Sequence, residues 1–289
     1  MKSHILNNTQ LSAEILIDWG YTRSRYDWGG TVKQVKKEGH TFISREERSD
    51  GSFGLGGVGL TNVFEWEDTS IYDKAAIADK FPLLGVGLCA KGDTLPFLFT
   101  KDYSVTPFQR IIEADNTHVS IRTLPHMVFG TAVDMEKTFT LDGSTLIVSF
   151  NIKNVGSEEI RAHEFCHNFM KFDGHKIDSS YKVSFPYSIQ VQMRRGQILL
   201  ERDAYRIGEM DAQTESSAYW LHGWEGMQSH WMKIENSDTN TAVLVEDNFP
   251  PCGFYVWNNE NACCPEVYAP IYLRSGESVS YERKYTFYT

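Results

Sequence analysis

The sequence lacks the features that mark an exported or membrane-spanning chain. Its first twenty residues hold no apolar run that ends in small residues, so we expect no signal peptide. No apolar stretch reaches the roughly 18 residues that a membrane-spanning helix needs. The five cysteines are odd in number and irregularly spaced, which favours reduced thiols over a disulfide framework. These absences predict a soluble protein of the cytoplasm.

Basic clusters are absent too. The chain has 28 basic and 38 acidic side chains and a net charge of -10, and its basic residues form only short pairs such as Arg194-Arg195. Nucleic acid and anionic membrane surfaces are therefore excluded as partners that bind through bulk electrostatics. A phosphorylated ligand would need a basic clamp, and the sequence concentrates none, so we expect a neutral or otherwise modified small molecule. No feature indicates an oligomeric state.

Helical periodicity is scarce as well. The best helical segment is 68–81, DTSIYDKAAIADKF, which predicts one short helix. An α/β architecture needs many more helices, and no repeat of fixed length indicates a propeller or solenoid. Neither a Pro/Ser-rich linker nor a low-complexity tract divides the chain. With 41% apolar residues available for a core, we expect residues 1–289 to form one domain.

The dominant signal that is present is period-two alternation in short runs between turn residues. In segment 144–156, STLIVSFNIKNVG, every second residue from Leu146 to Ile152 is a large apolar one, which is typical of a half-buried strand. Segment 133–143 alternates in the same way and ends in an Asp-Gly hairpin signal. Such runs recur along the whole chain. They predict a mainly β protein built as one large antiparallel sandwich or barrel.

Glycines gather in segment 51–62, GSFGLGGVGLTN, as they do in phosphate-binding loops. The segment lacks the Gly-Lys-Ser/Thr ending of a P-loop, and it neither follows a clear strand nor opens a helix. We therefore interpret the glycines as tight turns between strands, with a close backbone approach to a neighbour.

Two histidines four positions apart mark segment 162–174, AHEFCHNFMKFDG. If the segment is a strand, as its neighbours and the Asp-Gly turn favour, then His163, Phe165, His167 and Phe169 share one face. Three interpretations stay open. The imidazoles could ligate a metal, could be structural, or could take part in acid/base catalysis. Two histidines do not complete a metal site, no neighbouring His-X-His or carboxylate pair supplies the rest, and Glu164 would point to the other face.

An ordered set of segments carries a family resemblance. HEFCHNFMKFDG is followed by YKVSFPY, preceded by RYDWGGTV and KFPLLGVGL, and completed by CCPEVYAPIYLRSGESVSYERKYTF near the C-terminus. This set resembles the aldose 1-epimerase (galactose mutarotase-like) superfamily, and in particular its bacterial members, over nearly the whole chain. The resemblance implies a large antiparallel β-sandwich, the supersandwich fold, that binds a small-molecule sugar in an open groove and serves carbohydrate metabolism.

The resemblance also implies catalytic roles for two residues. His167 matches the general acid of mutarotases and Glu266 matches their general base, and a sugar held between the two would exchange its anomers by ring opening and closing. This chemistry requires no metal and no organic cofactor. A metal-dependent isomerase that uses His163 and His167 is a less favoured alternative. A non-catalytic carbohydrate-binding or sensing protein on the same scaffold is the main alternative.

Sugar contacts are expected from four further residues: His163, Asn168, Arg25 and Trp257. Aromatic side chains offer flat faces for the C-H surface of a sugar, and Trp257, Phe254 and Tyr268 are aromatic neighbours of Glu266 in the sequence. The upstream histidine of classical mutarotases has no counterpart in its usual motif. His126 is the histidine in that part of the chain.

Overall fold

The alternating segments of the sequence form strands in the computed structural model, which describes residues 2–17, 23–47 and 53–289. Strand β14 (Thr145–Asn154) buries every second residue from Leu146 onward, as its sequence pattern predicts. Strand β13 (Val133–Asp142) pairs with it in antiparallel register, and Asp142 and Thr145 flank the turn. The prediction of a mainly β chain is confirmed.

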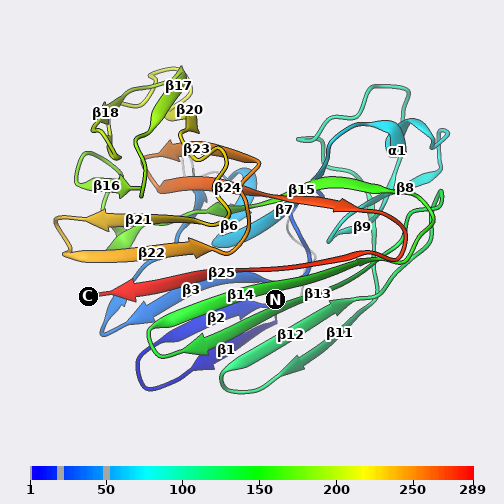
Figure 1. Cartoon of the computed structure of the whole chain (residues 1–289), viewed down its shortest axis with the longest axis horizontal. Helices are drawn as coiled ribbons and strands as arrows, with labels where there is room; N and C mark the ends of the chain where they lie inside the picture. Colours follow the sequence, from blue (N-terminus) through cyan, green and yellow to red (C-terminus); the bar gives the residue numbers. More distant parts are fainter. Residues whose placement is uncertain (1, 18–22, 48–52) are drawn as a thin grey trace.

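Most strands belong to two ten-stranded antiparallel sheets, which Figure 1 shows stacked on each other. The first sheet contains, in spatial order, β1 (Ser3–Asn7), β2 (Ser12–Leu16), β3 (Thr31–Lys37), β7 (Leu60–Trp66), β15 (Ile160–Asn168), β24 (Ala262–Leu273), β23 (Gly253–Asn259), β20 (Ser216–His222) and β17 (Gln190–Arg195), with β4 (His40–Thr41) beside β3.

The second sheet has the order β11 (Arg110–Ala114), β12 (His118–Thr123), β13, β14, β25 (Ser278–Tyr288), β22 (Thr241–Asp247), β21 (His230–Asn236), β16 (Tyr181–Ser184), β19 (Ala204–Ile207) and β18 (Ile198–Leu200). Because strands distant in the chain lie side by side, as β15 and β24 do in the first sheet and β14 and β25 in the second, residues far apart in sequence meet in the same layer. The architecture is therefore the large antiparallel β-sandwich that the sequence predicts.

Smaller elements cover the ends of the sandwich. A three-stranded sheet of β8 (Lys80–Leu83), β9 (Gly87–Ala90) and β10 (Val105–Pro107) lies at one end beside helix α1 (Ser70–Asp73), at the upper right of Figure 1. A two-stranded sheet pairs β5 (Arg45–Glu47) with β6 (Phe53–Val58), and a 3-10 turn, η1 (Phe172–Gly174), follows β15. Helix α1 lies inside segment 68–81, where one short helix is predicted. No helix of the described ranges is long and apolar enough to cross a membrane.

The core between the sheets combines apolar packing with a buried polar network. Phe64 of the first sheet meets Phe150 of the second edge to face, with ring centroids 6.0 Å apart. Arg283 of β25 donates hydrogen bonds to Glu164 of β15 at 2.9 Å and to Asp247 of β22 at 3.2 Å, and all three side chains are fully buried. The two layers are therefore joined by charge pairing as well as by apolar contact.

The glycine-rich segment forms the adjoining ends of β6 and β7, and its residues 51–52 lie outside the described ranges. Gly59, between the two strands, has a φ of +68°, and a Cβ there would lie 1.9 Å from the carbonyl oxygen of Val32. Glycine is required at this position both by the left-handed backbone and by the close approach of β3. The interpretation as a turn residue near another backbone agrees with this geometry at Gly59, whereas Gly54 and Gly57 lie within strand β6.

Candidate functional site

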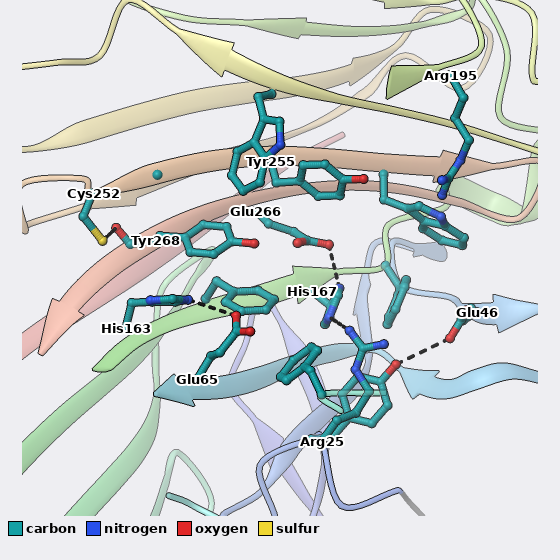
Figure 2. Close-up of a pocket in the computed structure, with 17 residues that line it drawn as sticks. Arg25, Glu46, Glu65, His163, His167, Arg195, Cys252, Tyr255, Glu266 and Tyr268 are labelled. Carbon is teal, nitrogen blue, oxygen red and sulfur yellow. Dashed lines mark hydrogen bonds and ion pairs between the residues drawn. The ribbon is translucent and has the colours of Figure 1, made fainter. Parts of the chain in front are cut away.

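An open pocket of about 540 Å³ lies on the face of the first sheet that points away from the second. Figure 2 shows side chains converging on it from several strands and from the segment around Arg25. The volume is in the range of small-molecule sites. The described residues that line it are Arg25, Tyr26, Glu46, Glu65, Phe99, His163, Phe165, His167, Phe169, Arg195, Trp220, Cys252, Gly253, Tyr255, Trp257, Glu266 and Tyr268.

Strand β15 supplies the floor of the pocket through its alternation. His163, Phe165 and His167 all line it, and Phe169, just after the strand, continues the row. The residues between them face the core, where Glu164 is fully buried beside Arg283. The prediction that this segment is a strand with both histidines on one face is confirmed.

The register between β15 and β24 brings His167 and Glu266 together. His163 pairs with Pro270 and Phe165 with Tyr268, and a bridge further along pairs Met170 with Cys263. The same register places His167 opposite Glu266. Their side chains meet at 2.6 Å between Nδ1 and Oε1, and they are 8% and 2% exposed. A nearly buried imidazole and carboxylate thus form a contact at the bottom of an open pocket.

Arg25 forms a hydrogen bond to the other ring nitrogen of His167, with its Nη2 3.2 Å from Nε2. A guanidinium can only donate, so Nε2 accepts, and Nδ1 carries the proton that is donated to Glu266. The Arg25 guanidinium is held between the rings of Tyr26 and Phe99, at 5.1 and 4.7 Å from their centroids. The imidazole is therefore fixed from both sides in one tautomer.

Buried charge pairing also anchors the segment that carries Arg25. Lys137 of β13 reaches from the second sheet to Asp27 at 2.9 Å and to the carbonyl oxygen of Gly30 at 2.7 Å. The other Asp27 oxygen accepts the amide N–H of Gly29 at 2.7 Å. Both charged side chains are essentially buried, at 1% and 0% exposure, so this loop is tied to the core close to the site.

Aromatic rings form the walls of the pocket. Tyr268 stacks on Phe165 with ring centroids 4.4 Å apart, and His167 stacks on Phe169 at 5.3 Å. Trp257 lies edge to face against Phe169. Burial raises the pKa of Tyr268 well above its ordinary value, so this phenol stays protonated. The walls therefore offer flat apolar faces and neutral hydroxyl groups, which suit the two kinds of surface that a sugar presents.

The comparison with solved structures now decides the fold family. A protein of Escherichia coli K12, whose assignment as an aldose 1-epimerase is provisional, has a TM-score of 0.61 at 13% identity, over 99% of both chains. A galactose mutarotase related enzyme of Lactobacillus acidophilus has 0.58 at 10% identity, over 100% of this chain and 98% of its own. A galactose mutarotase-like protein of Clostridium acetobutylicum has 0.58 at 16% identity, over 99% and 94%.

The chain has the galactose mutarotase-like fold. No protein-family model matches it, and no curated protein does. At sequence identities this low the likeness establishes the β-sandwich of the galactose mutarotase-like proteins, while the chemistry has to be argued from the side chains of the pocket.

One cluster among the described residues at the pocket offers three metal-ligand types. Atoms of His167, Cys264 and Glu266 lie within 4.8 Å of one another. Burial, followed by the nearby Glu266 carboxylate, raises the pKa of the Cys264 thiol well above its ordinary value, so the sulfur holds its proton. A metal on Nδ1 would also turn Nε2 into an N–H that faces the Arg25 donor, whereas ligating histidines donate that proton to an acceptor. The cluster therefore fits proton transfer better than metal binding.

His163 is outside that cluster and has a partner of its own. Its Nε2 lies 3.0 Å from Oε2 of Glu65, which stands directly opposite on β7. A metal shared by His163 and His167, the less favoured alternative, has no support from this arrangement. His126 lies elsewhere, at a second, smaller cavity beside Phe108.

The structure corrects two expectations about the site. Asn168 was expected to contact the sugar, but it faces the core, where it donates to the carbonyl oxygen of Pro265 at 2.6 Å and accepts from the Tyr285 hydroxyl at 3.0 Å. The physical reason is alternation, because a neighbour of His167 on a strand points to the other face. The acid and base were expected on opposite sides of a sugar, yet His167 and Glu266 are in direct contact.

The pocket brings together the other predicted residues and adds several that sequence reasoning missed. Arg25, His163, His167, Trp257, Tyr268 and Glu266 all line it, whereas Phe254 is fully buried in the core. The missed side chains include Glu46, Glu65, Trp220, Tyr255 and Arg195. Glu65 could have been found, since it is a carboxylate between two large apolar residues, Phe64 and Trp66, in β7. Arg195 could not, because a bulge determines its direction.

Proposed function

We propose that this protein is an aldose 1-epimerase-like enzyme that interconverts sugar anomers, with Glu266 as the general base and His167 as the general acid. One observation carries the proposal: the 2.6 Å contact between these two side chains at the bottom of an open, aromatic-walled pocket. The galactose mutarotase-like fold supports it. Soluble, cytoplasmic carbohydrate metabolism is the setting in which such an enzyme would act.

The reaction needs a base and an acid close to each other. Ring opening removes the proton of the C1 hydroxyl and delivers one to the ring oxygen, and closing on the other face reverses both transfers. The two oxygens are bonded to the same carbon. A neighbouring acid and base on one side of the sugar can therefore reach both, and no placement across the ring is required.

The two carboxylate oxygens of Glu266 have different surroundings. Oε1 receives His167 and also the thiol of Cys264, whose sulfur lies 3.4 Å away. Oε2 accepts no hydrogen bond from the described residues, and we assign to it the C1 hydroxyl proton. His167 donates from Nε2 to the ring oxygen after that nitrogen, which carries no proton while it accepts from Arg25, has taken a proton from solvent. Arg25 has to release Nε2 for this step, and sugar hydroxyls offer its guanidinium replacement acceptors.

A second function, sugar binding without turnover, is favoured by one specific feature. Both ring nitrogens of His167 are already engaged within the protein, one by Arg25 and one by Glu266. A histidine held so firmly could serve only to position hydroxyl groups. The protein would then be a carbohydrate-binding or sensing protein.

NMR measurement of anomeric exchange, with the wild type and with a variant that lacks the Glu266 carboxylate, distinguishes the two functions. If the enzyme proposal holds, Glu266→Gln should slow anomeric exchange by about 10² to 10⁴-fold, the usual contribution of a positioned acid or base. Sugar affinity, measured by calorimetry, should change little. Glu65→Gln is the matched control, because Glu65 lines the same pocket but pairs with His163. A sugar that binds the wild type without any accelerated exchange would support the binding protein instead.

A further inference from the structure

Arg195 reaches the pocket because of an irregularity in strand β17. Met193 pairs with Tyr219 of β20, but the next pair along joins Arg195 to Ala218, so that Arg194 is an extra, bulged residue. Ala218 shares a face with Trp220, which lines the pocket. The bulge therefore turns Arg195 onto the pocket face. Bulges often re-aim a side chain in this way beside functional sites.

The guanidinium of Arg195 is anchored at one nitrogen and open at the others. Its Nε donates to the hydroxyl oxygen of Ser216 at 2.8 Å, and the buried Ser216 donates in turn to Thr214 at 3.1 Å. Within the described ranges Arg195 forms no ion pair. Figure 2 shows its terminal nitrogens directed into the pocket, on the side of Glu266 opposite to His163. The two terminal amino groups are thus available for a ligand.

The carboxylates of the pocket, in contrast, are engaged within the protein. Glu65 pairs with His163 and Glu266 with His167. Glu46 accepts the amide N–H of Gly57 at 3.4 Å and the Tyr26 hydroxyl at 3.5 Å. Arg25 resembles Arg195, because no carboxylate of the described chain pairs with it and its buried Nε has no partner. Neither Arg25 nor Arg195 therefore forms an ion pair with a carboxylate of the described residues.

We propose that the sugar substrate carries an anionic group, a carboxylate or a phosphate, which Arg195 binds while C1 of the sugar lies at Glu266. This inference rests on the proposed epimerase function. A guanidinium anchored through Nε presents two parallel N–H donors, and these match the paired oxygens of a carboxylate or phosphate. The expectation of a neutral sugar followed from the absence of a basic cluster in the sequence. Folding assembles the positive charge from Arg25 and Arg195, which lie far apart in the chain.

The test compares one neutral and two anionic sugars as probes: glucose, glucuronate and glucose 6-phosphate. Calorimetry and exchange NMR are run on the wild type, Arg195→Met, Arg195→Lys and Arg194→Met. Arg194 is the matched control, since it is exposed and does not line the pocket. We expect one of the anions to bind the wild type at least about tenfold more tightly than glucose, as a charged hydrogen bond allows. Arg195→Met should remove that preference, Arg195→Lys should restore part of it, and Arg194→Met should leave it unchanged.

The outcomes distinguish the anionic substrate from the reaction itself. Glucuronate or glucose 6-phosphate as the tighter ligand identifies the group as carboxylate or phosphate. Equal affinity for all three sugars, or an equal loss of affinity for all three in Arg195→Met, overturns the anionic substrate even if anomers exchange. Neither anion binding at all also overturns it. Anions that bind through Arg195 without accelerated exchange refute the epimerase reaction and leave the anion site standing.

Discussion

Replacing Arg283 with methionine should destabilise the protein severely, because it leaves two carboxylates buried without their cation. Arg283 is fully buried and donates to Glu164, to Asp247 and to the carbonyl oxygen of Val267 at 2.7 Å. Burial acts to lower its pKa, but Glu164 and Asp247 raise it well above the ordinary value, so the cation persists. Methionine fills most of the volume and removes the charge.

The expected loss follows from the geometry of this network. Breaking a buried ion pair by removing one partner costs about 3–5 kcal/mol, out of a typical total stability of about 5–15 kcal/mol. Since the entropy of unfolding scales with chain length, this corresponds to a melting temperature lower by roughly 5–8 °C for a chain of 289 residues.

Urea unfolding followed by tryptophan fluorescence measures the effect. Arg274→Met is the control, because Arg274 is exposed and should change the free energy of unfolding by less than about 0.5 kcal/mol. The triple variant Arg283→Met, Glu164→Gln, Asp247→Asn should recover part of the lost stability, since it removes the unpaired charges together. A loss below about 1 kcal/mol in Arg283→Met alone would refute the view that this network holds the two sheets together.

Three further predictions concern the pH dependence of stability, the backbone and a pocket thiol. The hydrogen bond from Arg122 lowers the pKa of Asp134, so its contribution is present above the unfolded value of about 3.9 and is lost as the pH falls through the folded value. Asp134→Asn should therefore make the free energy of unfolding fall less steeply as the pH drops below about 5. The total difference should be less than about 1 kcal/mol because the pair is partly exposed, and the same pH dependence in both proteins, measured by urea unfolding, contradicts this. Gly59→Ala should lose more than about 2 kcal/mol of unfolding free energy. Gly143→Ala, at a similar φ but with only the Gln10 side chain within ordinary contact distance, should lose only about 1 kcal/mol; equal losses would show that the close approach is unimportant. Burial raises the pKa of Cys252 to about 11, so maleimide should label this thiol slowly at neutral pH. Because Cys252 lines the pocket, a saturating sugar should slow the labelling further; an unchanged labelling rate would show that the sugar binds elsewhere.

Much of the fold was predictable because strand alternation is a local property. The alternation from Leu146 to Ile152 predicts which side chains of β14 are buried, and the pattern from His163 to Phe169 predicts which side chains share the pocket face. The short helix in segment 68–81 was predictable for the same reason. Strand and helix positions and the faces of single strands could therefore be predicted, because each depends on one continuous segment of the sequence.

The geometry of the site depends on register between distant strands, which the sequence does not reveal. The contact between His167 and Glu266 requires β15 and β24 to pair in one particular alignment. The direction of Arg195 depends on a bulge, and the position of Arg25 on the buried pair that ties its loop to β13. Asn168 was the avoidable error, since its alternation with His167 already assigned it to the core face.

The most direct test of the central claim is the rate of anomeric exchange, measured by NMR at equal concentrations of wild type and Glu266→Gln. Urea unfolding should first establish that the variant is folded. If Glu266 and His167 transfer protons to and from the sugar, the wild type accelerates exchange of at least one neutral or anionic aldose, and the variant loses nearly all of that acceleration. Equal exchange rates with both proteins would contradict the assignment of Glu266 as the base.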